Sequence, residues 1–188
     1  MRSLDEIRKE IDSIDEQIKQ LLIRRLDCST EVVQAKIRDN NYNINRPERE
    51  EAMLDRLGQN VVEERKSGYL SVVRKITETS RMYQYGILFD QVPELFRKLS
   101  EGIDLSNATK TITVYLKRPD IPNAMSSILS MIGDYGYDMK SLQFLGYSPE
   151  GKAEFQLTIR GDISCTHMQK LLLQLSMESE DFRICETE

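Results

Sequence analysis

Apolar residues in the first part of the chain recur every three or four positions, which is the spacing of one face of a helix. The residues of this stripe are Leu4, Ile7, Ile11, Ile14, Ile18 and Leu21. Ser3 followed by Glu6 fits a capping box, and no glycine or proline occurs before Pro47. The pattern therefore predicts a helix over about residues 4–38, roughly 50 Å long. A helix of this length usually packs against a second copy or a second layer.

Two further helices are predicted before about residue 99. Residues 39–45 (DNNYNIN) indicate a loop, because Asp and Asn compete with the hydrogen bonds of a helix. Pro47 suits the first position of the second helix, which residues 66–68 are expected to break. The apolar stripe of that helix comprises Met53, Leu54, Leu57, Val61 and Val62. The third helix, expected to end near Leu99, carries Leu70, Val73, Ile76, Thr77, Ser80 and Gln84 at helical spacing.

The period changes from helical to alternating after the polar segment 100–110. Strands are predicted at residues 111–116, 138–148, 152–161 and 181–186, with helices at 121–136 and 164–177. This βαββαβ order is the ferredoxin-like, split-βαβ arrangement of an α+β domain. The sequence thus predicts an all-α domain over residues 1–99, a linker over 100–108 and the α+β domain over 109–188.

Charge and hydropathy exclude some classes of partner. The 188 residues carry a formal net charge of -5, whereas nucleic acids and anionic membranes are usually bound by an excess of Lys and Arg. We therefore expect no nucleic-acid partner and no membrane partner. The sequence has no run of eighteen apolar residues and no leader-like start, which predicts a cytoplasmic protein.

The cysteines and the histidine do not form a recognisable reactive site. Cys28, Cys165 and Cys185 are odd in number and far apart, so neither a disulfide framework nor a zinc site is expected. We expect reduced and mostly buried thiols. The single histidine, His167, is interpreted as an ordinary helix residue. The pattern therefore predicts no metal site and no Ser/His/Asp triad.

Two cations interrupt the core face of the first helix. Continuing the apolar stripe leads to Arg25 and Lys36, which share one face about 16 Å apart. One such cation is more often structural, because its stem is buried and its head reaches water. The third helix adds Ser80 and Gln84 on its own stripe. Glu50 alone cannot balance the charges of Arg8, Arg25, Lys36 and Arg49, and unpaired buried charges are costly. The set therefore predicts a site for a small dianion.

Four charged or polar segments occur in the helical half: LDEIRKEID (4–12), LLIRRLDCSTEVVQAK (21–36), PEREE (47–51) and TSRMYQ (79–84). Together they resemble the all-helical chorismate mutases. The resemblance covers about residues 4–90 and depends on the order and spacing of all four. It implies an intertwined homodimer of three-helix chains, in which each long first helix contributes to both active sites. It also implies catalysis without a cofactor or a covalent intermediate.

The resemblance implies a substrate and a role for each polar residue. Chorismate, a dianionic ring, would rearrange to prephenate by a concerted Claisen shift in phenylalanine and tyrosine biosynthesis. Arg25 would bind one carboxylate and the partner chain's Arg8 the other, since arginine pairs two-pronged with carboxylates. Lys36 and Gln84 would donate to the ether oxygen. Ser80 would contact a carboxylate, Arg49 would brace the anion site and Glu50 would accept from the ring hydroxyl. Because Gln84 donates as a neutral amide, we expect little loss of rate from about pH 5 to 8.

Arg46 departs from the family pattern. The family usually carries an acidic residue there, three positions before the arginine that matches Arg49. The loss of that carboxylate is expected to weaken the N-cap of the second helix. The loop before it is also one residue longer than in the short bacterial mutases.

The second half contains the segment RPDIPNAMSSILSMI (118–132), which passes from a predicted strand through a loop into a helix. With the βαββαβ order, it resembles the strand-loop-helix corner of an ACT domain, a small regulatory module of amino-acid biosynthesis enzymes. The resemblance implies effector-binding positions at Pro122, Asn123, Ala124 and Met125. Asn123 stands where a glycine is usual, and residues 141–148 lack the motif of phenylalanine-sensing members. An aromatic amino acid effector and a packing module without a ligand therefore both stay open.

Three hypotheses of function follow. The first is a chorismate mutase, feedback-regulated by an aromatic amino acid through the second half. An isochorismate pyruvate lyase with the same helical fold is the enzymatic alternative. A non-catalytic aromatic amino acid sensor or regulatory subunit is the third, although a pure scaffold has no reason to keep so many cations facing inward.

Overall fold

The computed structural model describes residues 2–121 and 124–188. The chain divides into two compact units, one ending at Ile87 and the other spanning Leu88–Glu188. Residues 88–99, expected in the helical domain, fall in the second compact unit. The division into domains at residues 100–108 stays a prediction.

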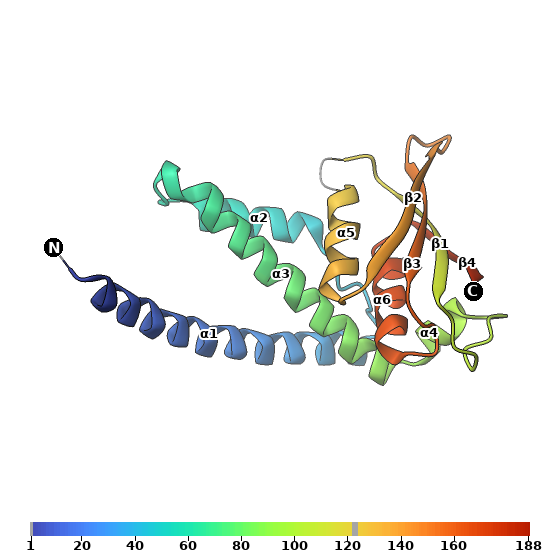
Figure 1. The fold of residues 1–188 in the computed structure, drawn as a ribbon, viewed down its shortest axis with the longest axis horizontal. Coiled ribbons are helices and arrows are strands. Elements are labelled where there is room, and N and C mark those ends of the chain that lie inside the picture. The colour runs from blue at the N-terminus through green and yellow to red at the C-terminus, as the bar shows by residue number, and fades with distance from the viewer. Residues whose placement is uncertain (1, 122–123) are drawn as a thin grey trace. The chain divides into compact units, whose positions relative to one another are not determined.

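The first helix, α1, runs over Leu4–Arg38 as predicted (Figure 1). Its capping box forms in full, because the Glu6 carboxylate accepts from the Ser3 N–H at 2.7 Å and the Glu6 N–H donates to the Ser3 hydroxyl at 3.3 Å. Asp39 is the C-cap, and Asn40 follows with a positive φ of 51°. The local signals at both ends of this segment therefore set its length.

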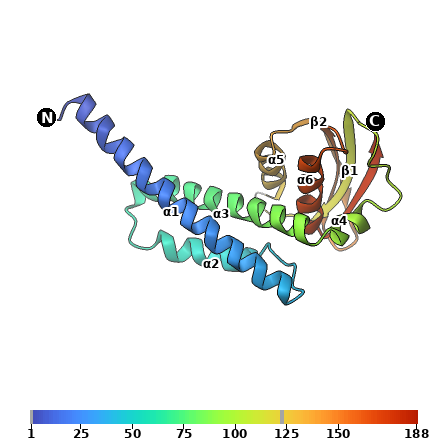
Figure 2. The same ribbon diagram turned by 90° about the horizontal axis from the view of Figure 1, so that it is seen from below.

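The second and third helices, α2 (Pro47–Gly58) and α3 (Glu63–Gln91), complete the first unit together with α1 (Figure 2). The predicted break at residues 66–68 is wrong, because α3 runs through them. Lys66 and Leu70 pack on the end of α2, where a Cβ on Gly58 would lie 3.3 Å from the Lys66 Cε. A glycine inside a helix costs only about 1 kcal/mol, so this packing outweighs the cost of Gly68.

The third helix also ends earlier than predicted. Pro93 cannot continue α3, because it lacks an N–H and its ring clashes with the preceding turn. A separate short helix, α4 (Glu94–Leu99), follows it. The prediction of one helix up to Leu99 is therefore wrong.

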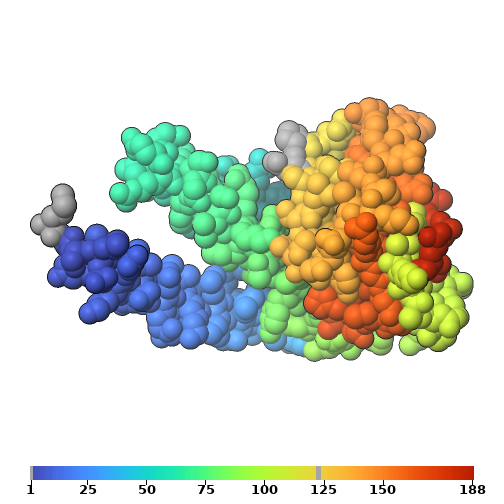
Figure 3. All heavy atoms as spheres, viewed as in Figure 1, coloured from blue at the N-terminus to red at the C-terminus, as the bar shows by residue number. Residues whose placement is uncertain are grey.

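The apolar stripe on the N-terminal half of α1 is exposed. The side chains of Leu4, Ile7, Ile11, Ile14, Ile18 and Leu21 are 39 to 62% exposed. The C-terminal half differs, since Val33 is fully buried. The space-filling view shows the start of α1 standing clear of the other helices of its unit (Figure 3). The packing within the first unit therefore covers only part of the stripe.

After α4, the second unit has the predicted βαββαβ element order. These elements are β1 (Thr111–Arg118), α5 (Ala124–Asp134), β2 (Asp138–Tyr147), β3 (Ala153–Arg160), α6 (Thr166–Met177) and β4 (Asp181–Thr187). The strands form one antiparallel sheet in the order β2-β3-β1-β4. Both helices lie on the same face of this sheet (Figure 1). The two helices cover the core of this unit. Alternate residues of β1 are fully buried there: Ile112, Val114 and Leu116.

The expected burial of the cysteines is wrong, since Cys28, Cys165 and Cys185 are all free and exposed. Two of them lie at exposed local positions. Cys165 is the N-cap of α6, and Cys185 lies on the edge strand β4, between the half-buried Ile184 and the exposed Glu186. His167 lies in α6, with its ring edge-on to Tyr135 at 5.1 Å between centroids.

Candidate active site

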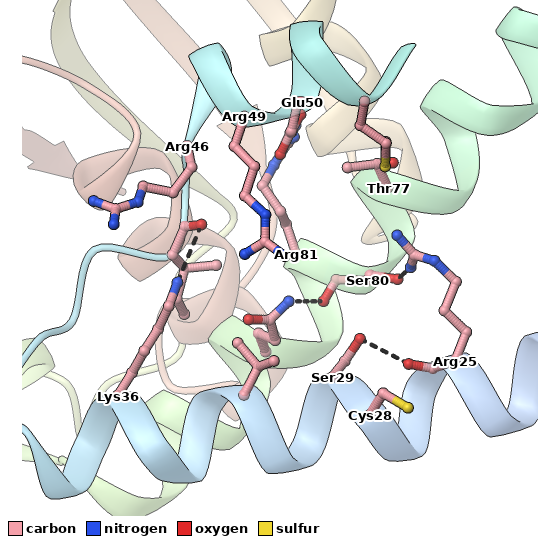
Figure 4. A pocket seen from close by; sticks show the side chains of 14 residues that line it. Arg25, Cys28, Ser29, Lys36, Arg46, Arg49, Glu50, Thr77, Ser80 and Arg81 are labelled. Atoms are coloured by element: carbon pink, nitrogen blue, oxygen red, sulfur yellow. Dashed lines mark hydrogen bonds and ion pairs between the residues drawn. The ribbon is translucent and has the colours of Figure 1, made fainter. Parts of the chain in front are cut away.

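A pocket of about 260 Å³ lies in the first unit, between α1, α2, α3 and the loop before α2 (Figure 4). This volume suits a small metabolite. Its lining residues are Arg25, Cys28, Ser29, Val32, Lys36, Ile44, Arg46, Arg49, Glu50, Met53, Thr77, Ser80, Arg81 and Gln84. Six of the seven residues expected to bind a dianion are therefore brought together within one chain.

Arg25 reaches across from α1 to α3. Its guanidinium donates to the Ser80 hydroxyl and, at 3.3 Å, to the carbonyl oxygen of Ile76. Ser80 is 4% exposed and donates to the same carbonyl at 2.9 Å. Both partners of Arg25 are neutral, so its positive charge stays available to an anion.

Lys36 lies at the other end of the pocket and holds the loop that precedes α2. Its ammonium donates to the carbonyl oxygen of Asn43 at 2.7 Å and to that of Ile44 at 3.5 Å. Burial lowers the pKa of Lys36 below the ordinary lysine value, and repulsion from Arg46 and then Arg49 adds to the shift. An ammonium has three donors, so one remains for a ligand.

Arg46 and Arg49 come from the start of α2. Arg46 is the N-cap residue and its side chain makes no cap hydrogen bond, in agreement with the expected loss at this position. It lines the pocket at the rim, with its guanidinium directed away from Arg49 (Figure 4). Arg49 instead extends from α2 toward α3 (Figure 4). The departure from the family pattern thus adds a cation beside Lys36.

Glu50 forms an ion pair with Arg81 of α3, and the two side chains are 25% and 12% exposed. The sequence reasoning missed Arg81, although it belongs to the segment TSRMYQ. The signal was present, because Arg81 follows Thr77 by four positions and therefore shares its inward face. Gln84 lies one turn beyond Ser80 and donates to the Ser80 carbonyl at 3.3 Å.

Arg8 is the expected site residue that the chain does not bring to its own pocket. It lies seventeen positions before Arg25 on α1, which is about 25 Å along the axis. Its side chain is 65% exposed and lies 3.7 Å from the Asp5 carboxylate.

The pocket has an excess of positive charge. Its lining includes Arg25, Lys36, Arg46, Arg49 and Arg81, against the single carboxylate of Glu50. Within residues 2–121 and 124–188, ion-pair partners are found for Glu50 and Arg81 but for none of the other four cations. Such an uncompensated set favours an anionic ligand with more than one charge.

Residues 7–85 match the family described as chorismate mutase type II. The matched segment contains Arg8 and every residue that lines the pocket. It supports a chorismate mutase-type function for this segment and leaves residues 86–188 unassigned. No curated protein and no solved structure matches the chain.

The expected effector positions lie in the second unit. Ala124 and Met125 line a surface hollow of about 400 Å³ together with Leu129 and Phe155. Pro122 and Asn123 lie outside the described residues.

Two further findings concern the described residues only. Within residues 2–121 and 124–188, no group of three potential metal ligands occurs. In the same ranges, every helix is too short or too polar to cross a membrane.

Proposed function

We propose that the protein is a chorismate mutase, which isomerises chorismate to prephenate for the biosynthesis of aromatic amino acids. The observation that supports it best is the set of uncompensated cations around one pocket, within the segment that matches this family. A substrate with two carboxylates would neutralise this set, and its ring would lie against Val32, Ile44 and Met53.

The reaction makes few chemical demands on the protein. In one concerted step the ether C–O bond breaks and a C–C bond forms within the same molecule, so no group enters or leaves. Rate enhancement then comes from holding the chair-like conformer and from stabilising the negative charge that grows on the ether oxygen. Fixed cations and neutral donors supply both effects.

The pocket offers a group for each of these tasks. Arg25 binds one carboxylate by its guanidinium fork, with Ser80 beside it, and Arg49 braces the anion from α2. The ammonium of Lys36 and the amide of Gln84 donate to the ether oxygen. Gln84 turns from its own helix to do so, which replaces a 3.3 Å contact with the Ser80 carbonyl. Glu50 accepts from the ring hydroxyl.

The proposed enzyme is a homodimer in which Arg8 of the partner chain binds the second carboxylate. Two observations support this arrangement: Arg8 lies far from the pocket of its own chain, and the apolar stripe beside it is exposed. Covering each of these half-exposed side chains contributes roughly 1 kcal/mol. Pairing the stripes of two chains therefore stabilises the dimer and brings Arg8 to the neighbouring site.

We propose the second unit as a ferredoxin-like module of the ACT type that binds an aromatic amino acid. The element order, the antiparallel sheet and the hollow beside Ala124 and Met125 support this reading.

Incubating the purified full chain with chorismate tests the proposed function. Prephenate is expected as the product, and the rate is expected to change when phenylalanine or tyrosine is added. Absence of chorismate turnover above the uncatalysed rate would refute the proposed enzymatic activity. Release of pyruvate from isochorismate, with chorismate untouched, would reassign it as a lyase.

The proposed donors also predict a pH profile. kcat/KM is expected to stay nearly constant from about pH 5 to 8, since Gln84 donates as a neutral amide and does not titrate. Above that range it falls as Lys36 loses its proton, and it does so earlier than for an ordinary lysine because the Lys36 pKa is lowered. Substrate carboxylates stabilise the ammonium, so kcat is expected to fall at a higher pH than kcat/KM.

The variant Arg46→Ala provides the matched comparison for this profile. It removes one of the charges that lower the Lys36 pKa, so its alkaline limb should move to higher pH. A steep fall of the wild-type rate above pH 6 would contradict the assigned donors. An unchanged limb in Arg46→Ala would contradict the effect of Arg46 on Lys36.

A further inference from the structure

The ion pair between Glu50 and Arg81 connects α2 to α3 at the wall of the pocket (Figure 4). The roles proposed above use the Glu50 carboxylate and leave Arg81 without a function. Both side chains are largely shielded from water. A charge pair in such a place interacts strongly, because solvent screens it little.

The remaining charges of the pocket make the position of Glu50 critical. Of the described residues that line the pocket, Glu50 alone is acidic. Arg49 is its neighbour on α2, and Arg25 and Lys36 lie on the facing helix. A Glu50 carboxylate released from Arg81 would be attracted to one of these cations. It would then compete with the carboxylates of the substrate.

We propose that Arg81 is a positioning residue that keeps Glu50 away from the cations that bind the substrate. By holding the carboxylate, Arg81 leaves Arg25, Lys36 and Arg49 to the substrate and presents Glu50 as the acceptor for a ring hydroxyl. The inference rests on the proposed function. It assigns the site to a ring that carries two carboxylates and one hydroxyl, with the hydroxyl at the α2 side of the pocket.

A purely structural tie between α2 and α3 would behave differently. Its loss would lower the melting temperature, and ligand affinity measured on the folded protein would stay the same. Under the proposal, affinity itself changes, and the effect of removing the Glu50 charge depends on whether Arg81 is present.

Four proteins test the proposal: the wild type, Glu50→Gln, Arg81→Met and the double variant. Calorimetry measures the affinity of each for prephenate, and chorismate kinetics gives KM and kcat. Arg81→Met is expected to weaken prephenate binding by about 10-fold and to raise KM more than it lowers kcat, within the usual range for coupled charges.

The decisive result is a change of sign. In the wild-type background, Glu50→Gln weakens binding, because a neutral amide oxygen is a weaker acceptor for the ring hydroxyl than a carboxylate. In the Arg81→Met background, the same substitution strengthens binding several-fold, because it removes a competing carboxylate. Arg81→Lys should keep most of the wild-type affinity, since it retains the charge.

Arg65→Met is the matched control, because it removes a positive charge from the same helix outside the pocket. The affinity of this variant for prephenate should stay within about twofold of the wild type, as expected for the loss of an exposed charge. Melting curves check that each variant is folded. Additive effects of the two substitutions, or a lower melting temperature with unchanged affinity, overturn the proposal for Arg81. If the wild type neither binds prephenate nor turns over chorismate, the proposed function fails and takes this inference with it.

Discussion

Arg25→Ala is expected to lower kcat/KM for chorismate by about 10³-fold, in line with the loss of one partner of a shielded charge pair. Both protein partners of the Arg25 guanidinium are neutral, a hydroxyl and a carbonyl. Its charge is therefore not used within the fold and is available to a substrate carboxylate. Steady-state kinetics on the folded variant measures the effect.

Two variants at and beside this position serve as controls. Arg24→Ala removes an exposed arginine from the next position of α1, outside the pocket, and should change kcat/KM by less than about twofold. Arg25→Lys should fall between the wild type and Arg25→Ala, because an ammonium keeps the charge and loses the two-pronged contact. If Arg25→Ala retained wild-type kinetics, the carboxylate site would have to lie elsewhere.

The second large effect is a recovery of activity. Arg8→Ala alone is expected to lose activity by at least about 10²-fold, through loss of a charge pair to the substrate. When Arg8→Ala and Arg25→Ala chains are combined in one dimer, one site receives both arginines and the other receives neither. A mixed dimer should therefore show about half of the wild-type activity, as the two-fold symmetry of the site requires.

Co-expression with two different tags, followed by purification on both, isolates the mixed dimer. Each parent dimer is measured beside it, and sedimentation gives the number of chains. A mixed dimer as inactive as its parents would contradict a shared site. A monomeric wild type would contradict it as well.

Much of the helical unit could be predicted from local signals. The capping box at Ser3 and the proline at position 47 set where α1 and α2 begin, because hydrogen bonds and the fixed φ of proline act within a few residues. The positions of Arg25 and Lys36 on one helix face follow from the helical repeat alone. The inward direction of these two side chains could therefore be predicted from the sequence, without knowledge of the packing.

The errors came from contacts between distant residues. The predicted break at residues 66–68 failed because Lys66 and Leu70 pack on Gly58, and local propensity carries no information on that packing. Arg81 differs, because the helical repeat alone predicts its place on the inward face of α3 and only its pairing needs the tertiary structure. Its importance arises from Glu50, which lies 31 positions away in the chain.

The sequence by itself determined the two periodicities, the starts of α1 and α2 and the residue types that a dianion requires, since all of these depend on near neighbours in the chain. Only the tertiary structure decided that Lys36 holds the loop before α2, that Arg46 lies at the pocket rim and that Glu50 is paired with Arg81. Which of the several cations Glu50 pairs with depends on the distances between the helices. Those distances are fixed by the packing of α1, α2 and α3 and not by the spacing within any one of them.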